Sequence, residues 1–457
     1  MSHRPAHQCA FLLLVLALGG CAAPSGSPPL DRTAKSSGLF KAGVSAAPAA
    51  SPSQAGQPAP IVLKRDSPRD VSSTLAPIIA RAKIPGAAAV VLYGDRIVAE
   101  GVAGVRKKGN DSPITLNDQF ELCSCAKAMG ATLVALLIED GKLSWDSTLG
   151  EIFGGAVTDM HPAWKSVTLQ QMLAHRAGLT DQHMFMLLTS VAFSNGPADQ
   201  RRSLARKILS HAPDLPPGTK AIYTSADYVM VGAALEQITG RTWEDLMQER
   251  LFRPLGITTA GFGPPGTPGR VDQPWGHGPR RLLYQPLPGA TDVPSDPGSI
   301  NADFPLAVAP AGLVHMSVID WAKFVSWQLR GDPANPHRKT TLLSADSFAH
   351  LHTADGGEIF NLPSDPKPIP NASYTSGWFT STWAWAKGPR PGDTGRVLYH
   401  AGDNQRWNCA VWVAPEIDFA VLVAFNRAWM WSQCTEAIDA LRREFAPKPE
   451  PVSRNQN

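Results

Sequence analysis

The chain has 457 residues, of which 43% are hydrophobic and 18% charged, and its formal net charge at pH 7 is +3. This length and composition allow a large buried core. The near-balanced charge, without any cluster of Lys and Arg interleaved with aromatic residues, argues against nucleic acid as a partner.

The first twenty residues have the features of a bacterial export signal. Arg4 precedes an apolar stretch at 9–18, which is too short to span a membrane stably. Leu18-Gly19-Gly20-Cys21 resembles a lipobox, which predicts that residues 1–20 are removed and that Cys21 is lipidated. A plain signal peptide cleaved near this point is the alternative.

Residues 21–65 are predicted to be a disordered tether. They are mostly Ala, Pro, Ser and Gly, so they cannot bury enough apolar surface to fold. About forty flexible residues span roughly 35 Å, enough to hold a domain clear of a bilayer. We therefore expect an exported protein, anchored by lipid in the bacterial cell envelope on the periplasmic side, whose membrane contact is the anchor at Cys21 alone. A folded domain is expected at 66–447, followed by a tail at 448–457.

Strand patterns occur at both ends of this domain. Residues 87–92 and 97–103, joined by a turn at Gly94-Asp95, predict a hairpin. Further strands are predicted at 396–399, 409–413 and 419–425. The chain between them is mainly helical, with helices predicted over 124–140, 168–175, 200–211, 226–239, 243–251 and 317–330. This order predicts an α+β fold, in which both chain ends build an antiparallel sheet and a helical lobe is inserted.

Two stretches, 262–308 and 352–395, are dense in Pro and Gly. Long loops that carry aromatic side chains often line a binding cleft, although packing on the core is the simpler interpretation for any single tryptophan. The aromatic residues concerned are Trp275, Tyr284, Tyr374, Trp378, Trp383 and Trp385.

The predicted domain contains four cysteines, at positions 123, 125, 409 and 434. The Cys123-x-Cys125 spacing is too tight for a usual zinc pair and the chain has no His-Glu-x-x-His, so we predict no metal site and no cofactor. Export would permit a Cys409–Cys434 disulfide. Four buried thiols are the preferred interpretation.

The segment Glu121-Leu122-Cys123-Ser124-Cys125-Ala126-Lys127 carries the strongest chemical signal. Positions i and i+3 share a helix face, so the amine of Lys127 can reach the hydroxyl of Ser124. A helix N-terminus also offers unpaired backbone N–H groups that favour an oxyanion. By itself the motif fits a capping serine beside a solvated lysine better than a catalytic pair, so the rest of the sequence must support the chemistry.

Two further elements follow Ser124-x-x-Lys127 in the chain. Ile222-Tyr223-Thr224-Ser225 comes after Pro216-Pro217-Gly218-Thr219 and before a predicted helix, and His400-Ala401-Gly402 opens a predicted strand pair. With these elements the chain resembles the Ser-x-x-Lys serine hydrolases, the superfamily of class C β-lactamases, penicillin-binding D,D-peptidases, D-aminopeptidases and related esterases. The resemblance covers about residues 70–445, and its smaller signatures are Ile84-Pro85-Gly86, Gly141-Lys142-Leu143-Ser144, 173–179, Gly240-Arg241-Thr242-Trp243, Pro254-Leu255-Gly256-Ile257 and Pro310-Ala311-Gly312-Leu313.

The resemblance implies a β-lactamase-like fold, with a five-stranded antiparallel sheet flanked by helices and a helical second lobe. It also implies that Ser124 attacks a carbonyl carbon to form an acyl-enzyme, while Lys127 and Tyr223 share the acid and base work. The oxyanion would bind the backbone N–H groups of Ser124 and Asp403. The implied substrate-binding residues are Ser225, His400, Gly402 and Asp403.

Lysine and tyrosine have ordinary pKa values near 10, so a base at neutral pH needs its pKa lowered by roughly three units, or about 4 kcal/mol. We expect protonated His400 to push Lys127 toward its neutral form, and nearby cations to favour a tyrosinate at Tyr223. Sequence does not separate the roles of these two groups. His175 is expected to be structural and Tyr228 to belong to the core.

Two positions depart from the β-lactamase pattern. Tyr223-Thr224-Ser225 replaces Tyr-x-Asn, and a serine hydroxyl reaches less far than a carboxamide. His400-Ala401-Gly402 replaces Lys-Thr-Gly, so a fixed cation becomes a group expected to titrate near neutrality. Hydrolysis of anionic substrates should then fall as the pH rises through the pKa of His400. An Asp403 carboxylate facing the pocket would oppose the developing oxyanion.

We therefore rank esterase or peptidase-like hydrolysis of a small-molecule, peptide or ester substrate above β-lactam hydrolysis. The alternatives are a class C-type β-lactamase and a non-catalytic relative that binds cell-wall peptides or β-lactams without turnover.

Overall fold

The computed structural model describes residues 60–182, 196–282, 285–287, 289–300, 302–354, 359–360 and 372–447. The predicted export signal at 1–20, the lipidation site at Cys21, the tether up to residue 59 and the tail at 448–457 lie outside the described residues. Within the described ranges, no helix is both long enough and apolar enough to cross a membrane.

The folded region begins slightly before the predicted boundary at residue 66. The backbone N–H of Lys64 donates to the carbonyl of Asp95 at 2.8 Å. The guanidinium of Arg65 donates to the carboxylate of Glu100 at 2.6 Å. These contacts attach the end of the predicted tether to the first hairpin of the domain.

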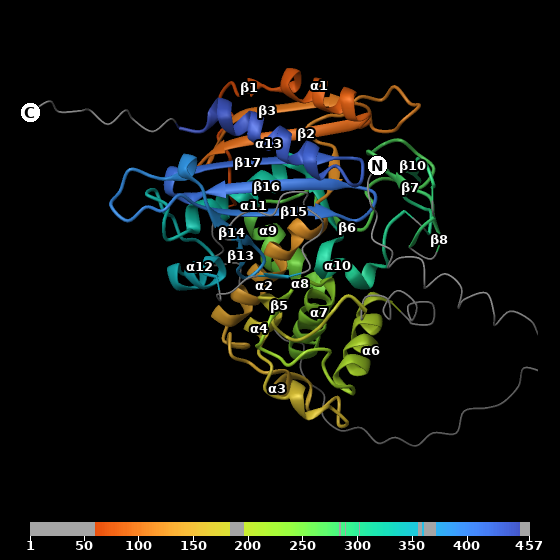
Figure 1. The fold of residues 1–457 in the computed structure, drawn as a ribbon, viewed down its shortest axis with the longest axis vertical. Coiled ribbons are helices and arrows are strands. Elements are labelled where there is room, and N and C mark those ends of the chain that lie inside the picture. The colour runs from red at the N-terminus through yellow and green to blue at the C-terminus, as the bar shows by residue number, and fades with distance from the viewer. Residues whose placement is uncertain are drawn as a thin grey trace, which may run out of the picture. The chain divides into compact units, whose positions relative to one another are not determined.

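An eight-stranded sheet forms the body of the domain (Figure 1). Its order is β1-β3-β2-β17-β16-β15-β14-β13, and all neighbouring pairs except β1 and β3 are antiparallel. The strands are β1 (Arg69–Asp70), β2 (Gly86–Tyr93), β3 (Arg96–Gly104), β13 (Ser373–Tyr374), β14 (Phe379–Thr382), β15 (Arg396–Asp403), β16 (Asn408–Ala414) and β17 (Phe419–Phe425). The five predicted strands are confirmed as the central β3, β2, β17, β16 and β15, and the other three extend the sheet at its edges.

The central strands are covered on both faces, which explains their nearly continuous apolar sequences. Alternate residues of β2 face opposite sides of the sheet. One set packs in a cluster with α1 (Ser72–Ala82) and α13 (Trp431–Phe445), and the other in a cluster with α11 (Val318–Gly331). These sets are Ala87, Ala89 and Val91, and Ala88, Val90 and Leu92.

The helical part of the domain occupies the side of the sheet opposite α1 and α13 (Figure 1). Its helices are α2 (Lys127–Glu139), α3 (Leu149–Phe153), α4 (Leu169–Leu173), α6 (Pro197–Leu209), α7 (Ser225–Thr239), α8 (Trp243–Leu246), α9 (Arg253–Leu255), α10 (Ala309–Gly312) and α12 (Ala345–His352). Short 3₁₀ segments are η2 (Cys123–Ala126), η3 (Pro162–Trp164), η6 (Leu306–Val308), η7 (Ala384–Ala386) and η8 (Pro415–Ile417), and η5 (Met247–Phe252) is π-helical.

All six predicted helices are confirmed, two of them in divided form. The helix predicted over 124–140 consists of η2 followed by α2, and that over 243–251 consists of α8 followed by η5. Helices α1 and α13 were not predicted, although α13 buries Cys434, Ala437, Ile438 and Leu441 at helical spacing.

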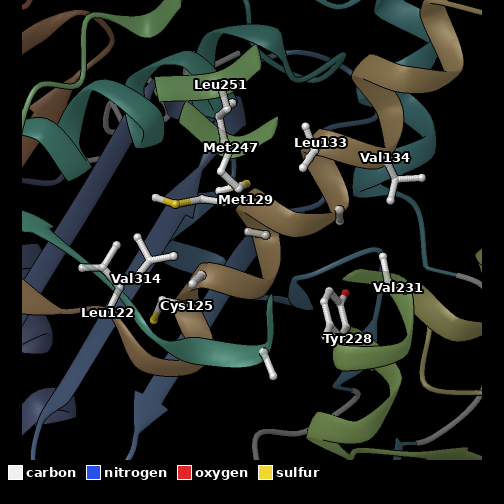
Figure 2. Close-up of a cluster of buried hydrophobic side chains, with 14 of the residues drawn as sticks. Leu122, Cys125, Met129, Leu133, Val134, Tyr228, Val231, Met247, Leu251 and Val314 are labelled. Atoms are coloured by element: carbon white, nitrogen blue, oxygen red, sulfur yellow. The ribbon is translucent and has the colours of Figure 1, made fainter. Parts of the chain in front are cut away.

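Helix α2 lies at the centre of the helical part and is buried all round from its first residue to Leu137. Figure 2 shows Met129 and Leu133 of α2 next to Met247 and Leu251 of η5, with Tyr228 of α7 on another side. A helix buried on every face has no freedom to shift, so it holds the residues at its N-terminus in place.

Four smaller sheets occur in the described residues. Their strands are β4 (Gln119–Glu121), β11 (Val314–Ser317) and β6 (Gly261–Phe262); β10 (Asp292–Ser295) and β7 (Gly276–Pro279); β12 (Ile359–Phe360) and β5 (Ala221–Ile222); and β8 (Arg281–Leu282) and β9 (Gln285–Pro286). Strand β4 ends three residues before Ser124 and β5 ends directly before Tyr223. Two of these small sheets therefore position predicted site residues.

Candidate active site

Ser124 lies in the tight turn η2 between β4 and α2. The turn requires Cys123 to adopt a left-handed backbone conformation with φ +47°, which costs a residue with a side chain about 1–2 kcal/mol. Cys123, Cys125 and Ala126 are buried, whereas Ser124 is partly exposed. The strained turn thus leaves the Ser124 side chain accessible although its neighbours in the turn are buried.

The contact predicted between Lys127 and Ser124 is present. The Nζ atom of Lys127 lies 3.1 Å from Oγ of Ser124 and donates to the carbonyl oxygen of Ala311 at 2.7 Å. The side chain is fully buried, and this burial lowers the pKa of Lys127 from 10.5 to about 7. Near neutral pH a large fraction of Lys127 is therefore an uncharged amine, able to accept a proton.

Tyr223 follows β5 and is buried beside the same amine. Its ring centroid lies 5.0 Å from Nζ of Lys127. Burial raises the pKa of Tyr223, and a hydrogen bond with Ser124 opposes this shift without reversing it. The expectation of a favoured tyrosinate is therefore wrong, because the loss of water on burial raises the pKa of Tyr223 more than the hydrogen bond with Ser124 lowers it. The phenol remains protonated and can act as a proton donor.

Ser225 is the first residue of α7 and is partly exposed. The helix is capped by the preceding residue, since Oγ1 of Thr224 accepts from the backbone N–H of Ala226 at 3.2 Å.

Tyr228 is fully buried, as expected of a core residue, and donates to the carbonyl of Leu173 at 3.0 Å.

His175 lies behind Tyr223, closer to the site than the sequence indicated. Its carbonyl accepts from the N–H of Ile222 at 2.8 Å, and its ring centroid lies 4.6 Å from that of Tyr223. Nδ1 of His175 lies 2.8 Å from Oδ2 of Asp227. Burial lowers the pKa of His175 and raises that of Asp227, so it disfavours the charged form of each group. His175 therefore supports Tyr223 from behind, which agrees with a structural role.

His400 is buried, with 1% of its surface exposed. Its Nδ1 donates to the carbonyl of Ala401 at 2.8 Å, and its Nε2 lies 3.3 Å from the hydroxyl of Tyr374. Burial, with a smaller contribution from Lys127, lowers the pKa of His400 to about 3. The expectation that His400 titrates near neutrality is therefore wrong. His400 was also expected to lower the pKa of Lys127. The low pKa of Lys127 results from burial of its own amine instead.

Strand β15 passes directly beside the serine turn. It pairs with β14 only as far as Tyr399, so on that side residues 400–403 border the site, while on the other side they pair with β16. A Cβ atom on Gly402 would lie 2.8 Å from the backbone nitrogen of Ser124 and 2.6 Å from the carbonyl oxygen of Leu122. Only glycine permits this approach.

The carboxylate of Asp403 is held by two backbone donors. Oδ1 accepts from the N–H of Gln405 at 2.7 Å, and Oδ2 accepts from the N–H of Trp429 at 2.5 Å. Burial raises the pKa of Asp403 to about 7, against the effect of these bonds. Near neutral pH the Asp403 carboxyl group is therefore only partly charged, and its oxygens accept hydrogen bonds from Gln405 and Trp429.

The four cysteines of the domain are free and buried, as predicted. Sγ of Cys409 lies 3.6 Å from Sγ of Cys125, whereas Sγ of Cys434 lies 3.4 Å from Oδ1 of Asn408. Within the described ranges, no group of three or more His, Cys, Asp or Glu residues could hold a metal ion.

Of the loop aromatics, Tyr374 belongs to the site, and its ring centroid lies 4.7 Å from that of His175. Trp275 and Trp378 are packed in the interior. Trp383 and Trp385 stack with each other and with Trp412 of β16. Tyr284 lies outside the described residues.

Comparison with known proteins identifies relatives over most of the domain. Residues 71–437 match the Beta-lactamase family model. The chain is 35% identical over 179 residues to Penicillin-binding protein 4 of Amycolatopsis lactamdurans. That alignment covers 38% of this chain and 44% of the relative, so the chain spans less than half of that protein's length.

Solved structures share the fold. The octameric penicillin-binding protein homologue from Pyrococcus abyssi matches with a TM-score of 0.62 and 19% identity, covering 83% of this chain and 77% of that chain. A D-stereospecific amidohydrolase from Streptomyces sp. matches with a TM-score of 0.59 and 19% identity, covering 83% of this chain and 98% of that chain. The predicted β-lactamase-like fold is thereby confirmed.

Proposed function

The chain belongs to the β-lactamase family, whose members are serine hydrolases, and we propose that it cleaves an ester or amide bond through an acyl-enzyme on Ser124. The contact between Ser124 and Lys127 carries this proposal. An amine 3.1 Å from a serine hydroxyl, fully buried and with its pKa lowered to about 7, has the position and basicity of a general base.

The proposed reaction has two halves. Neutral Lys127 accepts the hydroxyl proton while Oγ of Ser124 attacks the carbonyl carbon, and the oxyanion accepts hydrogen bonds from the N–H groups of Ser124 and Asp403. Protonated Tyr223 then donates its proton to the leaving oxygen or nitrogen and regains one from the Lys127 ammonium. In the second half, water attacks the acyl carbon while Lys127 accepts its proton; the bond between the acyl carbon and Oγ then breaks, and Oγ takes that proton from the Lys127 ammonium, which releases the acid and restores Ser124.

The charges around the site favour a substrate without a carboxylate next to the reacting bond. His400 is neutral above its pKa of about 3, so it offers no fixed cation to a substrate anion. The exposed carboxylate of Asp181 lies close enough to raise the pKa of Lys127 and would repel an anion. Esters and amine-bearing amides, including D-amino acid amides, therefore rank above β-lactams as substrates.

A fluorophosphonate probe tests the nucleophile. Wild-type protein should gain one adduct by intact mass, located on Ser124 by peptide mapping, and Ser124→Ala should gain none. An unlabelled but folded wild-type protein would instead support a non-catalytic binding relative.

A substrate panel tests the reaction class. Purified protein is assayed with p-nitrophenyl acetate, D-alanine p-nitroanilide and nitrocefin. We expect turnover of the ester or the anilide to exceed that of nitrocefin, with Ser124→Ala inactive on all three. Faster turnover of nitrocefin would make the protein a class C-type β-lactamase and would contradict the charge argument.

We also propose that the protein is exported and anchored through a lipid at Cys21 on the periplasmic side of the cell envelope, with a small-molecule, peptide or ester substrate and no nucleic-acid partner. The lipobox-like Leu18-Gly19-Gly20-Cys21 and the apolar stretch at 9–18 support this proposal. Metabolic labelling with an alkyne fatty acid should mark the wild-type protein in the membrane fraction. Equal labelling of Cys21→Ser would refute it.

A further inference from the structure

A buried polar network joins the two chain segments that flank the proposed oxyanion site. It consists of Glu121, Asp303 and Asn404, each at most 5% exposed. Glu121 ends β4, three residues before Ser124. Asn404 directly follows Asp403 at the end of β15. The network thus connects the segments that carry the two proposed N–H donors, which lie far apart in the chain.

The side-chain amide of Asn404 is the centre of this network. Its Nδ2 donates to the carboxyl group of Glu121 and, at 3.0 Å, to Oδ1 of Asp303. Its Oδ1 accepts from the backbone N–H groups of Arg406 at 3.1 Å and Trp407 at 3.0 Å. Both N–H bonds and both acceptor sites are used, so the amide cannot rotate without losing hydrogen bonds in a buried place.

Glu121 and Asp303 form a carboxyl pair in which each hydrogen-bonds the other. Burial raises the pKa of Asp303 to about 6 and raises that of Glu121 well above its usual value, which favours a proton shared by the pair. The guanidinium of Arg281 donates to the carbonyl of Asn404 and attracts the charge of Asp303. A shared proton and a neighbouring cation allow two carboxyl groups to be buried together.

We propose that Asn404 and Glu121 are positioning residues, whose hydrogen bond fixes the spacing between the backbone N–H groups of Ser124 and Asp403. The inference rests on the proposed function. Oxyanion donors act only within a narrow range of distances, and a displacement of about 1 Å can cost a hundredfold in rate. The bond between Glu121 and Asn404 clamps the two segments where Gly402 already brings their backbones into close approach.

Two substitutions at Glu121 separate positioning from simple stability. Glu121→Gln retains an oxygen that accepts from Asn404 and places an N–H toward Asp303 in the position of the shared proton, so kcat should stay within about threefold of wild type. Glu121→Leu removes the acceptor and should lower kcat for p-nitrophenyl acetate by about 100-fold, with KM changed by less than about threefold. Asn404→Ala should reproduce the loss caused by Glu121→Leu.

Asn335→Ala is the matched control, because Asn335 is also buried and also uses both N–H bonds of its amide, which donate to the carbonyl of Leu329 at 3.0 Å and to Oδ1 of Asp418 at 2.7 Å. It should lower thermal stability without lowering kcat. If Asn404→Ala does not fold, the comparison of Glu121→Gln with Glu121→Leu decides.

The outcomes distinguish the two proposals. Wild-type protein without adduct or turnover refutes the proposed function, and the positioning role with it. Active wild-type protein in which Glu121→Leu keeps its kcat, or in which Glu121→Gln loses as much as Glu121→Leu, refutes the positioning role alone.

Discussion

Replacing Lys127 by methionine should stabilise the protein while removing its activity. Lys127 is buried at the N-terminus of α2, and burial lowers its pKa from 10.5 to about 7. This lowering corresponds to about 5 kcal/mol of unfavourable free energy for the charged form in the folded state. Methionine has a similar length and no charge to desolvate, so the variant escapes this cost.

The expected gain is smaller than the full cost, because methionine leaves the carbonyl of Ala311 without the donor that now lies at 2.7 Å. Such an unpaired buried carbonyl costs about 1–3 kcal/mol. At pH 6, where Lys127 is charged in both states, Lys127→Met should therefore raise the free energy of unfolding by about 2–4 kcal/mol. Activity should fall to the level of Ser124→Ala.

The gain should disappear at high pH. Between pH 7 and 10.5 the unfolded state binds a proton on Lys127 that the folded state lacks, so the stability of the wild-type protein rises with pH by about 1.4 kcal/mol per unit. The variant lacks this dependence, and near pH 10 it should be slightly less stable than wild type.

Urea unfolding followed by tryptophan fluorescence at pH 6, 8 and 10, at constant ionic strength, measures this difference. Lys142→Met is the matched control, because Lys142 is exposed and its charge is not desolvated. A Lys127→Met variant less stable than wild type at pH 6, or a stability difference independent of pH, would refute the reasoning.

Three further predictions concern the site and the sheet that supports it. For a neutral ester, kcat/KM should rise with pH up to about 7, as Lys127 becomes neutral, and then level off; a pH–rate profile that still rises above pH 9 would contradict Lys127 as base. Tyr223→Phe should lower kcat by about 10²-fold or more with little change in KM, measured by steady-state kinetics, because it removes the proton donor to the leaving group. Asp332→Asn should lower the free energy of unfolding by about 3 kcal/mol at pH 7, because Asp332 is buried between Arg396 at 2.5 Å and His352 at 2.7 Å. These partners hold the pKa of Asp332 well below its usual range, so the loss should shrink as the pH falls below about 4, and denaturant unfolding at several pH values checks both statements.

The features that the sequence predicted correctly depend on short-range geometry. The contact between Ser124 and Lys127 follows from a separation of three residues at the start of a helix, and that contact is present at 3.1 Å. Strands such as β2 and β17 were identifiable because they are short apolar runs of small and β-branched residues next to turn sequences. The resemblance to a known family added the order of the motifs, and with it the fold.

The features that the sequence left undetermined depend on neighbours from distant parts of the chain. Asn404 bonds to Glu121 across 283 positions and to Asp303 across 101 positions, and no local pattern indicates such partners. The direction of the Asp403 carboxylate likewise depends on Trp429, which lies in another loop.

Residue types and spacing thus determined that Ser124 and Lys127 meet, since a helical turn brings the same positions together in any protein, and the resemblance added Tyr223 and His400. The tertiary structure decided their protonation states. His400 was expected to be charged and is neutral, and Tyr223 was expected to ionise readily and does not. The physical reason is desolvation: the free energy of a charge depends on how much water the surrounding segments exclude, and that exclusion arises only when the whole domain has packed.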